Sequence, residues 1–264
     1  AHLYLTKIKK IYVANADATI AKGAKAYLLY QFEFYGIKTP LRRKICKEFY
    51  KTHPIKDHNE LSSLIKACFA EPQREIHYFA IELLGHHHQL WSTKTIPLIE
   101  WMITHQSWWD SVDSTNSFVI SKFFLKFPEL TALTTAKWNQ SSNKWLKRMS
   151  LLFQLTYKAK TNTALLTQFI ENCQLEEDFF IRKAIGCAAV SGLIIAIFGT
   201  TSFIIAGWNV PDLPAYSFGY VYLPASQTMD RVEIKAVHNN GSNILAQTQT
   251  TATNTWTKLC LLYT

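Results

Sequence analysis

The sequence predicts an all-α, helical-repeat fold over residues 1–186, followed by two segments of different character. Apolar residues recur three and four positions apart in several windows of this part, which is the period of a helix with one buried face. No stretch of useful length alternates apolar and polar residues before residue 186. The 264 residues include only 9 Gly and 8 Pro, which is few for a β protein of this length.

The helices are expected in order from their apolar stripes and end signals. One stripe is Leu61, Leu64, Ile65 and Cys68, and the next is Ile76, Phe79, Ala80 and Leu83, with Gly85 as a C-terminal cap. First-turn prolines and polar caps mark further starts at Pro40, Pro97, Pro128, Ser141–Asn143 and Thr161–Thr163. Helices of this length joined by short breaks are typical of stacked helix pairs, although no strict sequence period is visible.

The character of the chain changes after Lys183. Residues 184–211 form a run without a charged side chain, and this run is long enough to span a bilayer. The alternative is a buried helical hairpin broken at Gly199. After Ala225 the chain becomes polar, and residues 246–255 are a Thr/Gln-rich run predicted as tail or loop. We therefore divide the chain into residues 1–186, 187–225 and 226–264.

The net charge of +9 lies entirely in the first part. Residues 1–183 carry 25 Lys/Arg and 16 Asp/Glu, whereas residues 184–264 carry three of each. A basic, aromatic-rich domain favours a polyanionic partner, and the alternative is incidental basicity. The five cysteines are scattered and form no CxxC pair, which indicates a reducing, cytoplasmic setting with neither disulfide framework nor zinc site. The sequence indicates no signal peptide and no cofactor motif.

The most informative motif is Ser107-Trp108-Trp109-Asp110-Ser111-Val112-Asp113. Two adjacent tryptophans cannot both face one core from a helix, so one is expected near solvent. Trp109 and Asp113 are four apart and share a helical face. An aromatic face beside a carboxylate attracts a cation. The alternative is that both tryptophans are core residues and that Asp110 or Asp113 caps a helix beginning near Ser114.

Basic residues form a second candidate site. A Thr-Pro helix start followed by cations places positive charge beside free backbone N–H groups, which favours phosphate. Arg148 lies off the apolar stripe of its helix and is expected to reach a phosphate or a carboxylate. The His86–His88 run does not converge on one helical face, so we expect no metal site there. The candidate phosphate-contacting residues are Lys38, Thr39, Arg42, Arg43, Lys44, Lys47 and Arg148.

Taken together, these segments resemble the DNA alkylation repair family typified by AlkD. The resemblance rests on Tyr27, on GIKTPLRR at residues 36–43, on SWWDSVD at 107–113, on Asn143–Arg148 and on EDFFIRKAIG at 177–186. It implies a HEAT-like solenoid that binds duplex DNA as a monomer. It also implies a monofunctional glycosylase for N3- and N7-alkylated purines, with Asp113 catalytic and with Trp109 and Tyr27 contacting the lesion.

The resemblance ends after Gly186. The family pattern continues with a tryptophan as a second aromatic wall and then a basic repeat, but this chain has Cys187. Residues 190–225 instead resemble part of a TauE/SafE-type membrane permease, which indicates a fusion or frameshift and membrane association of residues 187–211. Two rival functions therefore stand beside the glycosylase: a non-catalytic nucleic-acid-binding scaffold and a protein-interaction module.

Overall fold

The computed structural model describes residues 2–196 and four later stretches, residues 216–222, 232–237, 243–248 and 256–262. The chain divides into two units, residues 1–153 and 154–264. The helices of the first unit are α1 (His2–Ala14), α2 (Ala18–Tyr27), α3 (Thr39–Thr52), α4 (His58–Phe69), α5 (Arg74–His86), α6 (Thr95–Thr104), α7 (Trp109–Thr115), α8 (Ser121–Lys126), α9 (Thr131–Asn139) and α10 (Lys144–Leu152). Short 3₁₀ turns lie at His88–Leu90 (η1) and Pro128–Leu130 (η3), and a π-helical turn lies at Asn116–Ile120 (η2).

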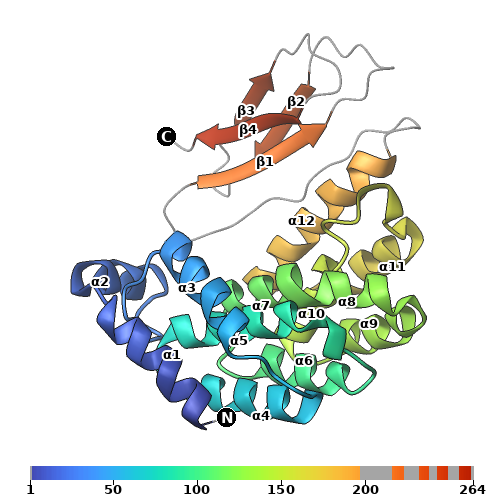
Figure 1. Ribbon diagram of the computed structural model, residues 1–264. Helices are drawn as coiled ribbons and strands as arrows, with labels where there is room; N and C mark the ends of the chain where they lie inside the picture. Colours follow the sequence, from blue (N-terminus) through green and yellow to red (C-terminus); the bar gives the residue numbers. More distant parts are fainter. Residues whose placement is uncertain (1, 197–215, 223–231, 238–242, 249–255, 263–264) are drawn as a thin grey trace. The chain divides into compact units, whose positions relative to one another are not determined.

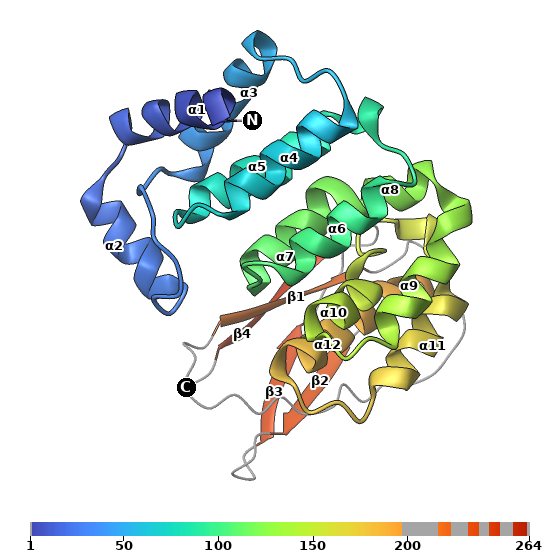
Figure 2. The ribbon, with the colours of Figure 1, turned by 90° about the horizontal axis from the view of Figure 1, so that it is seen from below.

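Successive helices of the first unit pair through connections of a few residues. Helix α4 packs on α5, α6 on α7, and α9 on α10, and the second helices α5, α7 and α10 contact one another in series (Figures 1 and 2). This is the stacked helix-pair arrangement that the sequence predicts, and the helical-repeat fold is confirmed.

A constant spacing underlies this stacking. Helices α3, α5, α7 and α10 begin at residues 39, 74, 109 and 144, so each start is 35 residues after the previous one. In the second unit, α12 (Phe179–Ala196) begins a further 35 residues along the chain. The repeat is therefore regular in helix position although the residues themselves show no strict period.

The predicted apolar stripes form the core. All eight residues of the two stripes on α4 and α5 are buried. The Asn143 side chain accepts from the N–H groups of Trp145 and Leu146, as expected for a helix cap. Pro40 and Pro97 lie in the first turns of α3 and α6, and Pro128 opens η3 just before α9.

Gly85 differs from its prediction. It lies inside α5, which continues to His86, and is not a residue beyond the helix end. A Cβ atom at Gly85 would lie 2.8 Å from the carbonyl oxygen of Phe118 in η2. Glycine is thus needed because the backbone of another helix approaches closely. This requirement comes from the tertiary structure, and the position of the glycine near the helix end resembles a cap only by coincidence.

The loop before α3 is held by a buried carboxylate of α5. Glu75 accepts hydrogen bonds from the backbone N–H groups of Tyr35, Gly36 and Ile37, at 3.1, 2.8 and 3.2 Å for the shortest contact of each. Gly36 has φ 86°, and a side chain there would overlap the carbonyl oxygen of Asp17. These contacts fix where α3 begins, and with it the basic residues of that helix.

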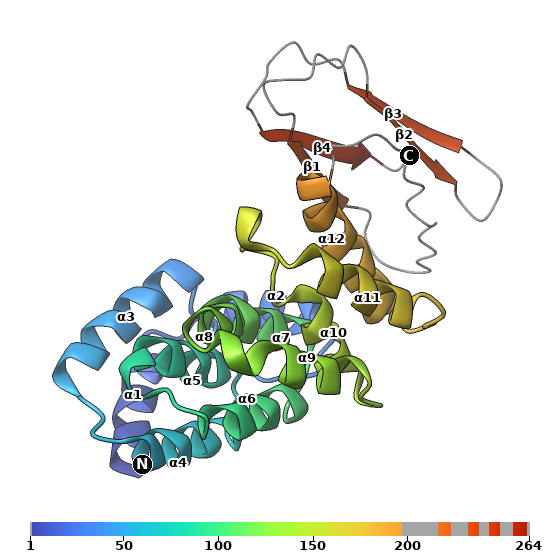
Figure 3. The same ribbon diagram turned by 90° about the vertical axis from the view of Figure 1, so that its right-hand side faces the viewer.

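The second unit contains α11 (Thr163–Cys173), α12, the 3₁₀ turn η4 (Lys158–Lys160) and four strands. The strands are β1 (Tyr216–Tyr222), β2 (Val232–Val237), β3 (Asn243–Thr248) and β4 (Trp256–Leu262). Figure 3 shows two antiparallel pairs, β1 with β4 and β2 with β3. Three of these strands, β2, β3 and β4, lie in the segment that the sequence predicts as a polar tail. The period-2 alternation of Val232–Val237 and the β-branched and aromatic content of the other strands explain the difference.

The uncharged run is described only in part. Its first residues continue α12 to Ala196, and residues 197–211 lie outside the described part of the chain. Among the helices that are described, none combines the length and the apolar character that crossing a bilayer requires.

Candidate active site

A cleft in the first unit collects five of the residues that the sequence singled out, namely Thr39, Arg42, Arg43, Trp109 and Asp113. Its volume is about 370 Å³. The lining comes from α3, α5, α7 and the turn η2 that follows α7. Its members are Thr39, Arg42, Arg43, Tyr78, Ile81, Glu82, Trp109, Asp110, Asp113, Ser114, Ser117 and Phe118.

The 35-residue spacing explains why these residues meet. Arg43, Tyr78 and Asp113 are each the fifth residue of their helix, and all three line the cleft. Glu82 and Ser117 line it too, and both lie eight residues after a helix start. Equivalent positions of stacked helices face the same side of the array, so one repeat position builds one wall.

The two tryptophans of the motif face different surroundings, as expected. The Trp108 ring lies against buried Trp145, with ring centroids 6.1 Å apart. The Trp109 ring lines the cleft and meets Tyr27 edge to face, with centroids 5.7 Å apart at 78°. Helix α7 begins at Trp109, so neither Asp110 nor Asp113 caps a helix near Ser114, and the capping alternative is wrong.

Asp113 is held by Arg148 in a two-point contact. The Nε and Nη2 atoms of Arg148 donate to the two carboxylate oxygens at 2.9 and 2.7 Å. Asp113 stays partly exposed to the cleft, whereas Arg148 is buried. Of the two partners expected for Arg148, the structure provides the carboxylate. A guanidinium bound at two points fixes both the position and the orientation of that carboxylate.

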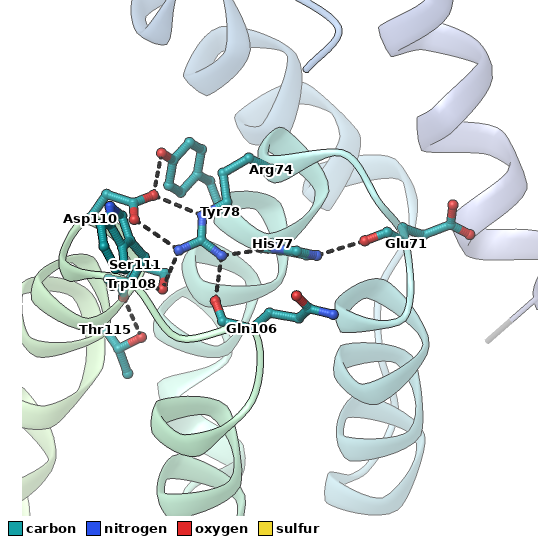
Figure 4. Close-up of polar contacts among 9 residues, drawn as sticks. All are labelled: Glu71, Arg74, His77, Tyr78, Gln106, Trp108, Asp110, Ser111 and Thr115. Atoms are coloured by element: carbon teal, nitrogen blue, oxygen red, sulfur yellow. Dashed lines mark hydrogen bonds and ion pairs between the residues drawn. The ribbon is translucent and has the colours of Figure 1, made fainter. Parts of the chain in front are cut away.

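Asp110, three residues earlier on α7, belongs to a buried network around Arg74 (Figure 4). Arg74 donates through Nε and Nη2 to both Asp110 oxygens, at 2.8 Å each, and also through Nη2 to Ser111 Oγ at 2.7 Å. Its Nη1 donates to the carbonyl oxygen of Gln106 at 2.7 Å. The Tyr78 hydroxyl donates to Asp110 at 2.6 Å. Arg74 thus ties α5 to the loop before α7 and to the first turn of α7.

Gln106 and His77 complete this network. Gln106 has φ 48°, a left-handed conformation that non-glycine residues adopt at a cost, and its carbonyl oxygen accepts from Arg74. Burial, followed by the nearby Arg74 charge, lowers the pKa of His77 to about 4. His77 is therefore neutral near pH 7, so Nδ1 accepts from Arg74 while Nε2 donates to the Glu71 carbonyl oxygen.

The basic residues of α3 divide into exposed and buried members. Arg42 is buried and donates to Glu82 Oε1 at 2.8 Å, which differs from the expectation of a phosphate contact. Glu82, eight residues into α5, attracts it inward. Arg43 also reaches Glu82, at 3.4 Å, but remains exposed. The remaining predicted phosphate-contacting residues in this segment are exposed, namely Lys38, Thr39, Arg43, Lys44 and Lys47.

Cys187 belongs to the second unit, and the histidine run is not part of the cleft lining. Cys187 is a half-buried residue of α12 in the second unit. His86, His87 and His88 follow one another at the end of α5, where His87 is buried and the others are exposed. In the described part of the chain, no three His, Cys, Asp or Glu residues are grouped to hold a metal ion.

Tyr78, Glu82 and Arg74 are site residues that the sequence reasoning did not select. Tyr78 and Glu82 lie 35 residues before Asp113 and Ser117, so an offset search from the SWWDSVD motif would have found them. Arg74 likewise lies 35 residues before Trp109. Its burial and its partners depend on the loop before α7, which has no sequence pattern of its own.

Three comparisons place these features among known proteins. The profile of a family described as DNA alkylation repair enzyme matches residues 8–188. A solved structure described as a predicted DNA alkylation repair enzyme from Enterococcus faecalis is similar, with a TM-score of 0.65 and 28% identity, over 69% of this chain and 85% of that one. A probable membrane transporter protein of Haemophilus influenzae is 51% identical over 45 residues. Those residues are 17% of each chain, so this chain spans about a sixth of that curated relative.

Proposed function

The chain belongs to the DNA alkylation repair enzyme family, and on that premise we propose that it is a DNA glycosylase acting on cationic, N3- or N7-alkylated purines. The observation that carries the proposal is Asp113. Its carboxylate opens into the cleft beside the Trp109 ring and is oriented at two points by Arg148.

The chemistry requires little beyond stabilisation of positive charge. Alkylation at N3 or N7 makes the purine cationic, so the base takes the electron pair of the breaking C1′–N9 bond and leaves as a neutral molecule. Positive charge then develops on the sugar. A carboxylate and an aromatic face stabilise that charge without reorganising. Water adds at C1′ and loses a proton, which yields an abasic site and the free base.

Each group in the cleft has a role in this proposal. Asp113 stabilises the developing charge, Trp109 and Tyr27 present ring surfaces to the lesion-bearing nucleotide, and Arg148 positions Asp113. The exposed basic residues of α3 contact backbone phosphates and supply affinity that does not depend on sequence. Cys187 offers no aromatic face, so charge stabilisation rests on Asp113, Trp109 and Tyr27.

The test is release of 7-methylguanine from methylated duplex DNA. We expect Asp113→Asn to lower the rate of release by about 100- to 1000-fold, because one preorganised electrostatic contact to the transition state is lost. Affinity for the same duplex should change little, because phosphate contacts dominate it. Glu129→Gln, an exposed carboxylate outside the cleft lining, is the matched control and should release base at the wild-type rate.

Two outcomes contradict the proposal. If wild-type protein binds the duplex but releases no base, the chain is a nucleic-acid-binding scaffold and not a glycosylase. If Asp113→Asn loses affinity and release in equal proportion, Asp113 maintains the binding surface and is not the catalytic group.

A further inference from the structure

Arg43 is an exposed arginine of α3 that two other elements hold in place. Its side chain is 56% exposed, yet its Nε atom lies 3.4 Å from Glu82 Oε1 of α5, and its guanidinium carbon lies 5.3 Å from the ring centre of Phe118 in η2. All three residues line the cleft together with Asp113. A surface arginine normally samples many rotamers, so contacts from two separate elements restrict the direction in which its charge points.

The carboxylate of Glu82 holds Arg43 without neutralising it. Glu82 is buried and accepts a much shorter hydrogen bond, at 2.8 Å, from Nη2 of buried Arg42. One buried carboxylate therefore faces two guanidinium groups, and the closer, less solvated one compensates its charge. The excess positive charge of the three side chains lies on Arg43, the member that an anionic ligand can reach.

The Phe118 ring is carried by the π-helical turn η2, a rare type of turn that is frequent at functional sites. The N–H of Ser121 donates to the carbonyl oxygen of Asn116, five residues earlier. The side chains of the same two residues donate to carbonyl oxygens at the C-terminal end of α10, both at 2.8 Å. On the α5 side, Gly85 leaves room for the Phe118 carbonyl oxygen. The position of Phe118 is thus fixed by two neighbouring helices.

We propose that Phe118 is a positioning residue, whose ring fixes the guanidinium of Arg43 so that this arginine binds one backbone phosphate of duplex DNA in the cleft. A ring face attracts a guanidinium without taking up its hydrogen bond donors, so the terminal N–H groups can bind two phosphate oxygens. The inference rests on the proposed function, because it needs duplex DNA in the cleft. It adds a residue that acts through Arg43 and not through contact with the base.

The experiment measures the affinity of the full chain for an undamaged duplex at several salt concentrations. Arg43→Gln should lower the affinity on the order of tenfold and make the slope of log affinity against log salt shallower by about 0.9, because one phosphate contact is lost. Phe118→Leu keeps every charge, so the affinity should fall about threefold with little change in slope. In the Arg43→Gln background, Phe118→Leu should cause no further loss.

Two further variants separate positioning from packing. Phe118→Tyr keeps the ring face and should bind the duplex as the wild type does. Arg43→Lys changes only an exposed side chain, keeps its charge and loses the planar guanidinium, so its affinity should also fall about threefold. The matched control is Phe127→Leu, because the Phe127 ring faces the Lys126 ammonium at 5.4 Å outside the cleft lining. This control should leave the affinity unchanged.

Three results would overturn the inference. One is wild-type affinity in Phe118→Leu or in Arg43→Lys. Another is an equal loss from Phe118→Leu in the Arg43→Gln background, which would mean that the ring acts independently of Arg43. If the wild type releases 7-methylguanine in either case, the proposed function stands and only the positioning role fails. The third is the absence of any duplex binding by the wild type, which removes the proposed function together with this inference.

Discussion

Helix α7 supplies the aspartates of two arginine–aspartate pairs, Asp110 with Arg74 of α5 and Asp113 with Arg148 of α10, and the pairs share a geometry but differ in burial. Both are two-point contacts with nitrogen–oxygen distances between 2.7 and 2.9 Å. In the first pair, the side chains of Arg74 and Asp110 are 0% and 8% exposed. In the second, those of Arg148 and Asp113 are 5% and 38% exposed.

The difference shows how one helix carries a structural and a chemical carboxylate. Asp110 accepts from Arg74 twice and from Tyr78, so its oxygens are used within the protein. Asp113 is turned by roughly 60° around the helix from Asp110, and its side chain is the more exposed of the two although both line the cleft. A buried, fully bonded carboxylate fixes the helix, whereas a partly exposed and oriented one is available to a substrate.

The two pairs should differ most in how far the loss of the arginine lowers the free energy of unfolding. Arg74→Ala leaves Asp110 buried without its counter-charge and should lower the free energy of unfolding by about 3–5 kcal/mol in urea denaturation. Arg148→Ala leaves a carboxylate that water reaches, so the loss should be only about 1 kcal/mol. The double variant Arg74→Met/Asp110→Leu should recover much of the first loss. If it is no more stable than Arg74→Ala, an uncompensated charge is not the cause.

Base release should rank the pairs in the opposite order. Arg148→Ala frees the Asp113 carboxylate to rotate, and we expect release of 7-methylguanine to slow by about 100-fold while the fold persists. Arg148→Lys keeps the charge but loses the two-point geometry, so its rate should lie between that of Arg148→Ala and wild type. A wild-type rate in both variants would show that Asp113 needs no positioning by Arg148.

A pH titration should report on the network around the first pair, because His77 contacts Arg74. The pKa of His77 is about 4 in the folded chain and about 6.5 when unfolded, so below pH 6.5 only the unfolded chain gains this proton. The free energy of unfolding should therefore fall by roughly 2 kcal/mol between pH 7 and pH 5. His77→Gln should remove most of that fall, and buried His87, whose pKa burial also lowers, should leave a residual slope. The exposed His105→Gln variant should retain the wild-type slope.

Local rules predicted much of the first unit. The stripes on α4 and α5, the cap at Asn143 and the first-turn prolines depend on neighbours within one or two helical turns, and the structure confirms them. Trp108 is extended and precedes α7, whereas Trp109 opens the helix, so the separation of the two rings also depends on where the helix begins. Gly85 was misassigned because a helix-end glycine and a glycine under a crossing backbone look alike in sequence.

The sequence by itself determined that Asp113 and Trp109 share a helical face and that the basic charge lies in the helical part. Only the tertiary structure decided which arginines are available. Arg42 and Arg43 are adjacent in the chain, yet one is buried against Glu82 and the other is exposed. Arg148 faces Asp113 across 35 residues of sequence. The physical reason is that a charged side chain goes where desolvation is compensated, and its compensating partner comes from another repeat.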